Sequence, residues 1–440
     1  MNEKKSNVKK PNAIIYFIAY IILMPLIKLL FRLEIDRRNF TPPKGACITI
    51  CNHASFMDFL VVMLALYPRR YNAVAAQKFF LYKPLHWLLP LMGCIPKNLF
   101  DADVRSIIGV KKVLARGGAV LLFPEGRCEC DGVYAGMNTA TGKLIKKLEV
   151  PVVSCSIDGA YKCMPFWRKG KRFGRVRIVM SNLFTADSLK DLSVEQINEA
   201  VDRRMAREED PPLRTPRKNR ARRRPMTLHT FGQKRLAEGL QLILYWCPKC
   251  GQEFTTQTKG NVISCSACGN AAELDREMKL IPLSPDSVVP GSAGLPGADG
   301  LPTIHDWYRE QARYEAKKLH EDMDPICIKV RVQMPAAIPG GGMHFCGDGV
   351  LSLDPKGWHF NGELSGDKVS LFFPINTVPA LPIDPNDVFQ IYANGTFYCF
   401  VTEDPWAVIK YSVIGECAYW RFATDIKMTP RKDSGFAYER

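Results

Sequence analysis

The stretch ACITICNHASFMD, residues 46–58, decides the fold. Its first part, residues 46–51, is a short apolar run rich in Ile, Thr and Cys, which predicts a buried strand. Ser55 then opens an apolar segment that we expect to be helical to about Leu66. Ser55 and Asp58 have the S-x-x-D spacing of a helix capping box. The stretch therefore predicts a strand, a loop and a helix in succession.

His53 lies in the loop between the expected strand and the expected helix, five residues before Asp58. From a loop, its imidazole can fold back towards the Asp58 carboxylate. That contact would fix the imidazole tautomer and leave the other ring nitrogen for a substrate hydroxyl. The two residues are a candidate acid–base pair. The alternative is that Asp58 only caps the helix and His53 is an ordinary loop histidine.

A second stretch, AVLLFPEGR at residues 119–127, has the same form, a strand-like run followed by a polar turn. Arg127 carries a guanidinium group, which suits bidentate binding of a phosphate or carboxylate. Gly126 allows backbone N–H groups to approach a ligand closely. The turn is therefore a candidate anion-binding site. A surface ion pair between Glu125 and Arg127 is the structural alternative.

Taken together, NHASFMD (residues 52–58) and FPEGR (residues 123–127) resemble the motifs of the glycerophospholipid acyltransferase family, specifically its 1-acylglycerol-3-phosphate acyltransferase branch. Two weaker blocks agree with this resemblance. GCIP at residues 93–96 resembles the family's G-x-I/F-P block, and VPVV at residues 150–153 resembles its V-P-V block. The resemblance covers roughly residues 15–210, which is under half of the chain.

The resemblance implies that a fatty acyl group moves from a thioester donor, acyl-CoA or acyl carrier protein, to the free hydroxyl of 1-acylglycerol 3-phosphate. The product is phosphatidate, an intermediate of phospholipid biosynthesis. An alcohol must lose its proton as the new bond forms, and a neutral imidazole suits that task near neutral pH. We therefore assign His53 as the general base and Asp58 as the group that orients it. A positioned acceptor can attack the thioester directly, so no acyl-enzyme is required.

The resemblance also implies that Glu125, Gly126 and Arg127 hold the phosphate end of the acceptor, with Arg127 as the main cation. The sequence departs from the commoner family form at two places. In FPEGR no residue separates the glycine from the arginine. The family form has a basic residue three positions after the proline of the G-x-I-P block, but this position is Leu99 here. Lys97 is the candidate substitute for that cation. These departures leave another lysophospholipid, or glycerol 3-phosphate, as alternative acceptors.

The N-terminal segment is the candidate membrane anchor. The chain of 440 residues has a net charge of +16, which favours an anionic partner such as a membrane surface. Residues 13–31, AIIYFIAYIILMPLIKLLF, are apolar except for Lys28 and long enough to cross a bilayer. No small-residue cleavage site follows, which argues against a signal peptide. We expect residues 1–31 to form an anchor, spanning or interfacial, at the cell membrane with the active site facing the cytoplasm; a buried core helix is the alternative.

Beyond the anchor, the chain divides into several expected parts. Residues 32–210 alternate strand-like and helix-like stretches, which predicts an α/β domain, and the resemblance implies a glycerol-3-phosphate acyltransferase-like fold. We expect a basic linker and helix at residues 211–240, a Gly/Pro linker at residues 284–302 and a charged helix at residues 303–324. Short alternating strands predict an antiparallel β domain at residues 325–440. Its terminal helix makes a pleckstrin-homology-type or GRAM-type barrel one candidate; a generic antiparallel domain is the other.

Two CxxC pairs lie between these parts, Cys247 with Cys250 and Cys265 with Cys268. They are separated by 14 residues, and each pair is followed by glycine. Four thiolates at this spacing suit a tetrahedral Zn²⁺ ion, and a closed four-cysteine site is structural. We expect a zinc ribbon at residues 241–283, with no organic cofactor beyond the acyl donor. A redox CxxC is the alternative. The chain's fifteen cysteines, an odd number, indicate reduced thiols.

A protein of another class would also fit part of the chain. Zinc ribbons bind nucleic acid in some proteins, and residues 211–225 are strongly basic. On that hypothesis the protein is a nucleic-acid-binding or scaffold protein with a degenerate acyltransferase domain. However, no aromatic side chains for base stacking are interleaved with these charges, and both sets of candidate active-site residues are intact. We therefore expect membrane lipid, the lysophospholipid acceptor and the acyl donor as partners, and not nucleic acid.

Overall fold

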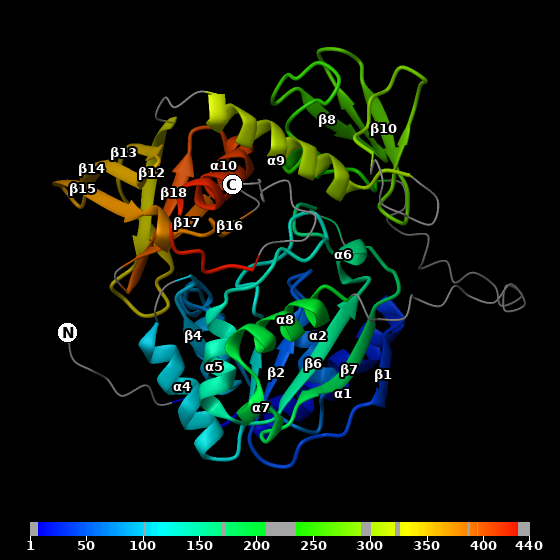
Figure 1. Cartoon of the computed structure of the whole chain (residues 1–440), viewed down its shortest axis with the longest axis vertical. Helices are drawn as coiled ribbons and strands as arrows, with labels where there is room; N and C mark the ends of the chain where they lie inside the picture. The colour runs from blue at the N-terminus through cyan, green and yellow to red at the C-terminus, as the bar shows by residue number, and fades with distance from the viewer. Residues whose placement is uncertain are drawn as a thin grey trace, which may run out of the picture.

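The computed structural model describes most of the chain: residues 8–100, 103–168, 170, 172–207, 235–291, 301–321, 326–384, 388–393 and 395–429. The basic linker expected at residues 211–225, and residues 292–300 of the Gly/Pro linker expected at residues 284–302, lie outside these residues. Figure 1 shows an α/β part below two antiparallel sheets, with one long helix running between those two sheets.

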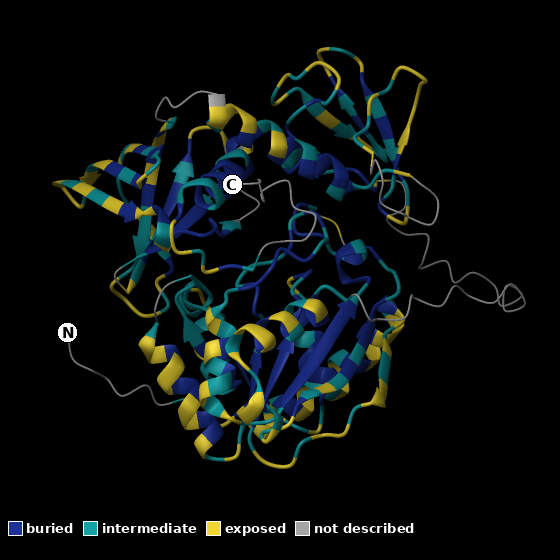
Figure 2. Cartoon of the chain, viewed as in Figure 1, coloured by how far each residue is buried: buried dark blue, intermediate teal, exposed yellow. Residues whose placement is uncertain are grey.

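The α/β part is built on a mixed sheet. Within the described residues it has seven strands in the order β1-β7-β6-β2-β5-β3-β4. All neighbouring strands are parallel except β6 and β7. Figure 2 shows the buried strands at the centre, among them β2, which the apolar run at residues 46–51 predicts. The strands are β1 (Glu34–Asn39), β2 (Cys47–Cys51), β3 (Tyr71–Ala76), β4 (Ile95–Lys97), β5 (Ala119–Leu122), β6 (Val152–Asp158) and β7 (Arg177–Phe184).

Helices cover this sheet and bury their apolar faces on it. On α5 and α8, for example, Ile145, Ile197 and Val201 belong to the core beneath β2 and β5. The helices of this part are α2 (Asp58–Ala65), α3 (Leu85–Leu91), α4 (Val104–Ala115), α5 (Ala140–Leu148), α6 (Ala160–Cys163), α7 (Ser188–Asp191) and α8 (Val194–Met205), with the 3-10 helix η1 (Gln77–Leu81).

The start of α2 differs from the sequence-based expectation. The helix begins at Asp58, not at Ser55, because the Ser55 hydroxyl accepts a hydrogen bond from Met57 N–H (3.3 Å) within a turn. The other half of the expected capping box is present, since the Asp58 carboxylate accepts from Ser55 N–H at 2.7 Å. Asp58 therefore stands at the first turn of α2 and faces back towards the loop that holds His53.

The N-terminal helix α1 (Ala13–Phe31) has the bounds that the apolar segment predicts. Both of its ends are hydrogen-bonded to the α/β part: Asn12 N–H donates to Leu91 O (3.0 Å) and Val176 N–H to Phe31 O (2.9 Å). One face is buried against the sheet and α2, while the other is exposed and apolar. By length and composition the helix could cross a membrane. The exposed large apolar residues are Ile14, Phe17, Ile18, Ile21, Ile22, Leu26 and Leu29, and Lys28 is exposed near the C-terminal end.

A small antiparallel sheet, in the order β11-β10-β9-β8, follows the α/β part. The long helix α9 (Ile304–Glu321) packs beside it, and the Gln311 amide contacts the backbone of Ile243, Tyr245 and Trp246. The strands are β8 (Thr256–Lys259), β9 (Val262–Cys265), β10 (Ala271–Leu274) and β11 (Leu280–Pro282), preceded by the 3-10 helix η4 (Leu240–Leu242).

The C-terminal part is a fully antiparallel sheet. Its seven strands, counted within the described residues, run in the order β15-β14-β13-β12-β18-β17-β16, and α10 packs on them. This confirms the antiparallel β domain that the alternating pattern predicts. The elements are β12 (Ile326–Pro335), β13 (Met343–Asp354), β14 (Gly357–Leu364), β15 (Asp367–Pro374), β16 (Ile383–Asp384), β17 (Val388–Ala393), β18 (Thr396–Thr402), the 3-10 helices η5 (Ile375–Thr377) and η6 (Pro405–Ala407), and α10 (Val408–Phe422).

One apolar core joins the three parts. It contains Tyr161 and Trp167 of the α/β part, Ile263 of the small sheet, Trp307 of α9 and Ile409 of α10. Such a continuous core indicates that the parts after residue 235 pack on the α/β part as one body rather than as separate domains on linkers.

Candidate active site

The sheet topology brings the two motifs together. β2 precedes His53, β5 precedes the turn Pro124–Arg127, and these strands are parallel neighbours. Because the carboxyl ends of parallel strands meet at one edge of a sheet, the loops that follow them meet there too. β3 and β4 end at the same edge, which places Lys97 beside the two loops.

His53 and Asp58 form the expected pair. His53 Nδ1 lies 3.1 Å from Asp58 Oδ2, and Asp58 is completely buried. A carboxylate accepts, so Nδ1 carries the proton and Nε2 presents its lone pair. The same carboxylate oxygen also accepts a hydrogen bond from Ser55 N–H. This second contact fixes the Asp58 carboxylate independently of the imidazole. The pair can therefore take a proton from a hydroxyl at Nε2.

The backbone of His53 is fixed from two sides. His53 N–H donates to Glu125 Oε1 at 2.7 Å, and Glu129 N–H donates to His53 O at 2.9 Å. The neighbouring Asn52 amide exchanges two hydrogen bonds with the backbone of Ile157 in β6. Glu125 is buried, and burial together with the nearby Glu129 carboxyl raises its pKa well above the ordinary value. Asn52, a residue that the sequence analysis did not single out, therefore positions the loop together with Glu125.

Cys128 is a second residue that the sequence pattern does not single out. Its Sγ lies 3.3 Å from His53 Nε2 and 3.5 Å from Nδ1. These nearly equal distances place the sulfur over the imidazole ring rather than in line with the Nε2 lone pair. Burial raises the pKa of the Cys128 thiol well above its ordinary value, which disfavours the thiolate that a nucleophile requires. Phe123 packs on the same ring, with centroids 4.5 Å apart.

Arg127 makes a contact that no local pattern predicts. Its two Nη atoms donate to the two carboxylate oxygens of Glu416 in α10, each at 2.8 Å. Both side chains are largely buried, with 14% and 9% of their surface exposed. Burial disfavours the charged guanidinium, but the attraction of the Glu416 carboxylate is larger than this effect, and the pKa of Arg127 is raised. The structural alternative, a surface pair between Glu125 and Arg127, is therefore wrong.

A cavity of about 690 Å³ joins these residues. His53, Lys97, Glu125, Gly126 and Arg127 all line it, whereas Asp58 lies behind the imidazole. Gly126 has a φ of +73°, and a Cβ there would lie 3.3 Å from the ring of Phe100. Most of the remaining lining is apolar, and the volume is typical of a ligand site.

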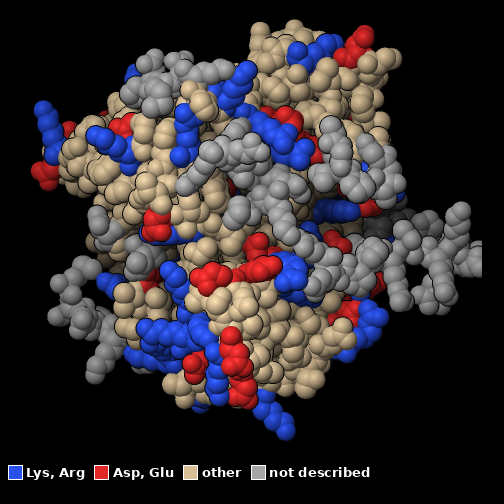
Figure 3. Space-filling model, in the orientation of Figure 1, with Lys and Arg blue, Asp and Glu red and all other residues tan. Residues whose placement is uncertain are grey.

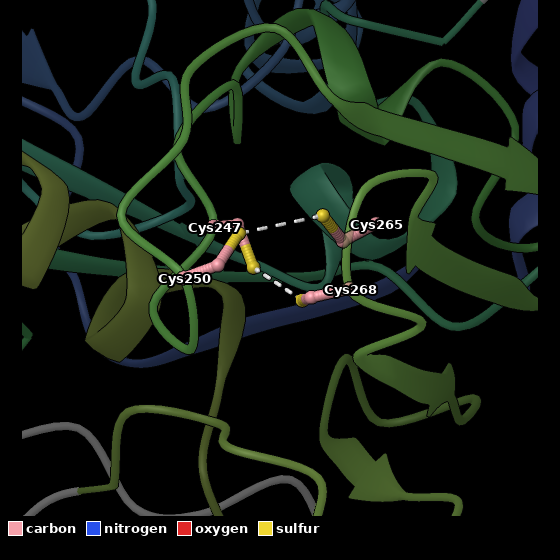
Figure 4. Close-up of side chains that lie close together, drawn as sticks. All are labelled: Cys247, Cys250, Cys265 and Cys268. Atoms are coloured by element: carbon pink, nitrogen blue, oxygen red, sulfur yellow. Dashed lines mark hydrogen bonds between the residues drawn. The ribbon is translucent and has the colours of Figure 1, made fainter.

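The four cysteines of the two CxxC pairs form a separate site. Their sulfur atoms all lie within 4.8 Å of one another, and Figure 4 shows them pointing inward from two loops. The Sγ atoms of Cys247 and Cys268 are 3.7 Å apart, and those of Cys250 and Cys265 3.8 Å. Tetrahedral Zn²⁺ with Zn–S bonds of about 2.3 Å requires S–S distances of about 3.8 Å, so the geometry fits.

The knuckles around these cysteines have the backbone that the sequence predicts. Gly251 and Gly269 adopt φ of +72° and +71°, a conformation that favours glycine. The thiols of the cluster shift in opposite directions: burial raises the pKa of Cys247 to about 12, whereas at Cys265 burial is outweighed by hydrogen bonds from the Thr255 hydroxyl and from backbone N–H groups, which lower the pKa to about 6. Thiolates are the form that binds a metal.

The α/β part of the chain is similar to known proteins. Residues 32–158 match the family model described as Acyltransferase. A 1-acyl-sn-glycerol-3-phosphate acyltransferase of Chlamydomonas reinhardtii is 27% identical over 170 residues, which is 38% of this chain and 51% of that protein. A chloroplastic one of Brassica napus is 26% identical over 169 residues, or 37% and 48%. The chain thus spans about half the length of these relatives.

Among solved structures, the 1-acyl-sn-glycerophosphate (LPA) acyltransferase PlsC of Thermotoga maritima is similar, with 19% identity and a TM-score of 0.39. The match covers 46% of this chain and 82% of that one. The family model ends at residue 158, well before the small sheet, α9 and the C-terminal sheet.

Proposed function

We propose that the protein transfers a fatty acyl group from a thioester, acyl-CoA or acyl carrier protein, to the free hydroxyl of 1-acylglycerol 3-phosphate, forming phosphatidate. The observation that carries this proposal is that the His53–Asp58 pair opens onto the same cavity as the FPEGR turn and Lys97. A base, an anion-binding turn and an apolar volume are what this reaction requires. The acyltransferase match over residues 32–158 supports the proposal independently.

In the proposed reaction, the acceptor hydroxyl donates to His53 Nε2 and attacks the thioester carbonyl. The imidazole takes that proton, and Asp58 stabilises the resulting imidazolium through Nδ1. Collapse of the tetrahedral intermediate breaks the C–S bond, and the imidazolium returns its proton to the departing thiolate. One ester forms, one thioester breaks, and the enzyme ends unchanged.

Arg127, Gly126 and Lys97 hold the acceptor phosphate in this proposal. Arg127 is the main cation, although it shares its Nη atoms with Glu416. Glu125 acts beside them as a positioning residue, because its carboxyl accepts from the His53 backbone. Another lysophospholipid, or glycerol 3-phosphate, is the alternative acceptor.

We propose that the protein works at the cytoplasmic face of the cell membrane, with α1 lying in the interface. Two features support an interfacial rather than a spanning helix: both ends of α1 are tied to the α/β part, and only its outer face is exposed and apolar. Figure 3 shows Lys and Arg side chains gathered over α4 and α5, which pack on the other face of the sheet from α1; this patch suits an anionic ligand such as a CoA moiety. The basic residues of these helices include Lys111, Lys112, Lys143 and Lys147.

For the remaining parts we propose the following organisation. Residues 32–210 are the acyltransferase domain, and residues 241–283 are a zinc ribbon that binds a structural Zn²⁺ ion through the four cysteines. Residues 325–440 are a β-rich domain of pleckstrin-homology type, which the strand order and the terminal α10 support. A degenerate enzyme domain in a nucleic-acid-binding protein is disfavoured, because the dyad and the anion-binding turn are both intact.

The test is a panel of acceptors presented in vesicles to the purified full chain. Lysophosphatidate, lysophosphatidylcholine and glycerol 3-phosphate are each combined with acyl-CoA and with acyl carrier protein, and the ester product is identified by mass spectrometry. The proposal predicts phosphatidate as the main product. If another acceptor is acylated faster, that acceptor takes the place of lysophosphatidate in the proposed function. Absence of any ester product would contradict the assignment of the protein as an enzyme.

A further inference from the structure

The C-terminal part is fastened directly to the loops around the cavity. Thr139 N–H donates to Lys427 O, and Thr429 N–H donates to Met137 O, both at 2.8 Å. The approach is close enough that a Cβ at Gly136, whose φ is +83°, would lie 2.3 Å from Thr429 O. The chain after α10 is therefore paired with the segment that follows the FPEGR turn.

Two further contacts fasten the same part elsewhere around the cavity. Gly342 N–H, between β12 and β13, donates to Leu81 O of η1 at 2.8 Å. The buried bidentate ion pair joins Glu416 of α10 to Arg127. Contacts at separate places, of which one is a buried ion pair, fix the orientation of the C-terminal part relative to His53.

The cavity that holds His53 extends to this C-terminal part. Its lining includes the apolar segment 381–383, which leads into β16, together with Gln390 of β17 and Ser412 of α10. The Gln390 amide is 1% exposed, and its Nε2 has no hydrogen-bond acceptor among the described residues. The α/β part alone thus forms only part of the wall.

We propose that the C-terminal β domain forms the far wall of the site for a substrate hydrocarbon chain, and that Ile383 limits the length of chain that fits. The inference rests on the proposed acyl transfer. An apolar wall contributes binding in proportion to the methylene groups that it buries. The chain belongs either to the thioester donor or to the lysolipid acceptor, and the experiment distinguishes these two sources.

The first experiment measures chain-length profiles for Ile383→Trp and Ile383→Ala. One series varies the donor (octanoyl, myristoyl and oleoyl thioesters) with one acceptor, and the other varies the acceptor chain with one donor. If the indole of Ile383→Trp displaces two or three methylene groups, kcat/KM for the longest chain falls by about 15- to 60-fold, since each methylene is worth about fourfold.

The kcat/KM value for the shortest chain changes little in Ile383→Trp, and Ile383→Ala shifts the preference towards longer chains. Ile326→Trp, at a half-buried position of the same sheet outside the cavity, is the matched control.

A shift in the donor series assigns the wall to the donor chain, and a shift in the acceptor series assigns it to the acceptor chain. Unchanged profiles in both series, with the wild-type protein active, would overturn the inference and leave the proposed function standing. An inactive wild type would instead contradict the proposed function.

A second measurement needs neither turnover nor a substitution. The full wild-type chain is irradiated with a fatty acyl-CoA, and separately with a lysophosphatidate, that carries a diazirine near the end of its hydrocarbon chain. The inference predicts labelled peptides from residues 376–393 in at least one of the two reactions. Labelling confined to residues 32–210 with both probes would overturn it.

Discussion

The imidazole of His53 receives its orientation from atoms close to it in the chain. Asp58 is five residues away and Ser55 two, so the pairing follows from a loop and one helical turn. That is why the sequence predicts it. The pairing of Arg127 with Glu416, separated by 289 residues, depends on how α10 docks and leaves no periodic signal in the sequence. Position 127 could be predicted as a cation, but its partner could not.

The shared guanidinium leads to a prediction about charge. Arg127→Ala should raise KM for lysophosphatidate about tenfold or more, because the charge-assisted contact proposed between the guanidinium and the acceptor phosphate is lost. KM for a neutral acceptor should change much less. Steady-state kinetics with both acceptors measure this difference, and an equal loss on both would contradict the role of Arg127 in binding phosphate.

Glu416→Gln is the complementary change. It should lower KM for lysophosphatidate, because Arg127 no longer shares its charge with a carboxylate. The thermal midpoint should also fall, since breaking a buried ion pair leaves the other charge uncompensated. An increase of KM in this variant would show that Glu416 assists, rather than competes with, the acceptor.

At the scale of elements, α1 carries an exposed apolar face on a helix that is tied at both ends. Phe17→Asp combined with Ile21→Asp should lower partitioning onto anionic vesicles about 100-fold or more, since each buried apolar side chain contributes about 1.5–3 kcal/mol. Flotation with Ile338→Asp as the exposed control measures this. Partitioning equal to that of the wild type would contradict the interfacial placement.

Glu253 links the small sheet to two helices, and its carboxylate contacts Lys318 of α9 (3.0 Å) and Lys410 of α10. Burial would raise the pKa of Glu253, but the hydrogen bonds from these lysines lower it below the ordinary value of 4.5. The stabilisation is therefore present above pH 4.5 and lost as the pH falls through the folded-state pKa.

Glu253→Gln should accordingly destabilise the protein by about 1–2 kcal/mol at neutral pH. The difference from the wild type should shrink as the pH falls below 4.5. Thermal midpoints measured across a pH series give this directly. A difference that stays constant with pH would mean that the variant acts through packing rather than through the two ion pairs.

At the scale of the molecule, the sequence predicts the separate parts better than their assembly. The continuous apolar run predicts α1, and the alternation of strand-like and helix-like stretches predicts the α/β part and the antiparallel C-terminal sheet, because each signal is local. The sequence does not predict that Trp167, Ile263 and Ile409 share one core, since long-range packing has no period in the sequence. The sequence does not predict that residues 381–383 form part of the cavity wall, for the same reason.

The shared core also links the cysteine cluster to the whole molecule. Cys247→Ser should abolish binding of one zinc ion per chain and lower the thermal midpoint, because a structural zinc site contributes directly to folding. Metal analysis and thermal unfolding measure both effects. The exposed Cys327, which lies outside the cluster, provides the control Cys327→Ser. Retention of stoichiometric zinc in Cys247→Ser would refute the ligand assignment.

The most direct test of the proposed chemistry is the turnover number of His53→Ala with lysophosphatidate and acyl-CoA. The variant keeps the backbone hydrogen bonds to Glu125 and Glu129, because both use main-chain atoms of residue 53, and therefore should fold normally. We predict a kcat about 100-fold or more below the wild type from loss of general base catalysis. The exposed His320→Ala control should be unaffected. A His53→Ala protein that turns over at the wild-type rate would contradict the mechanism.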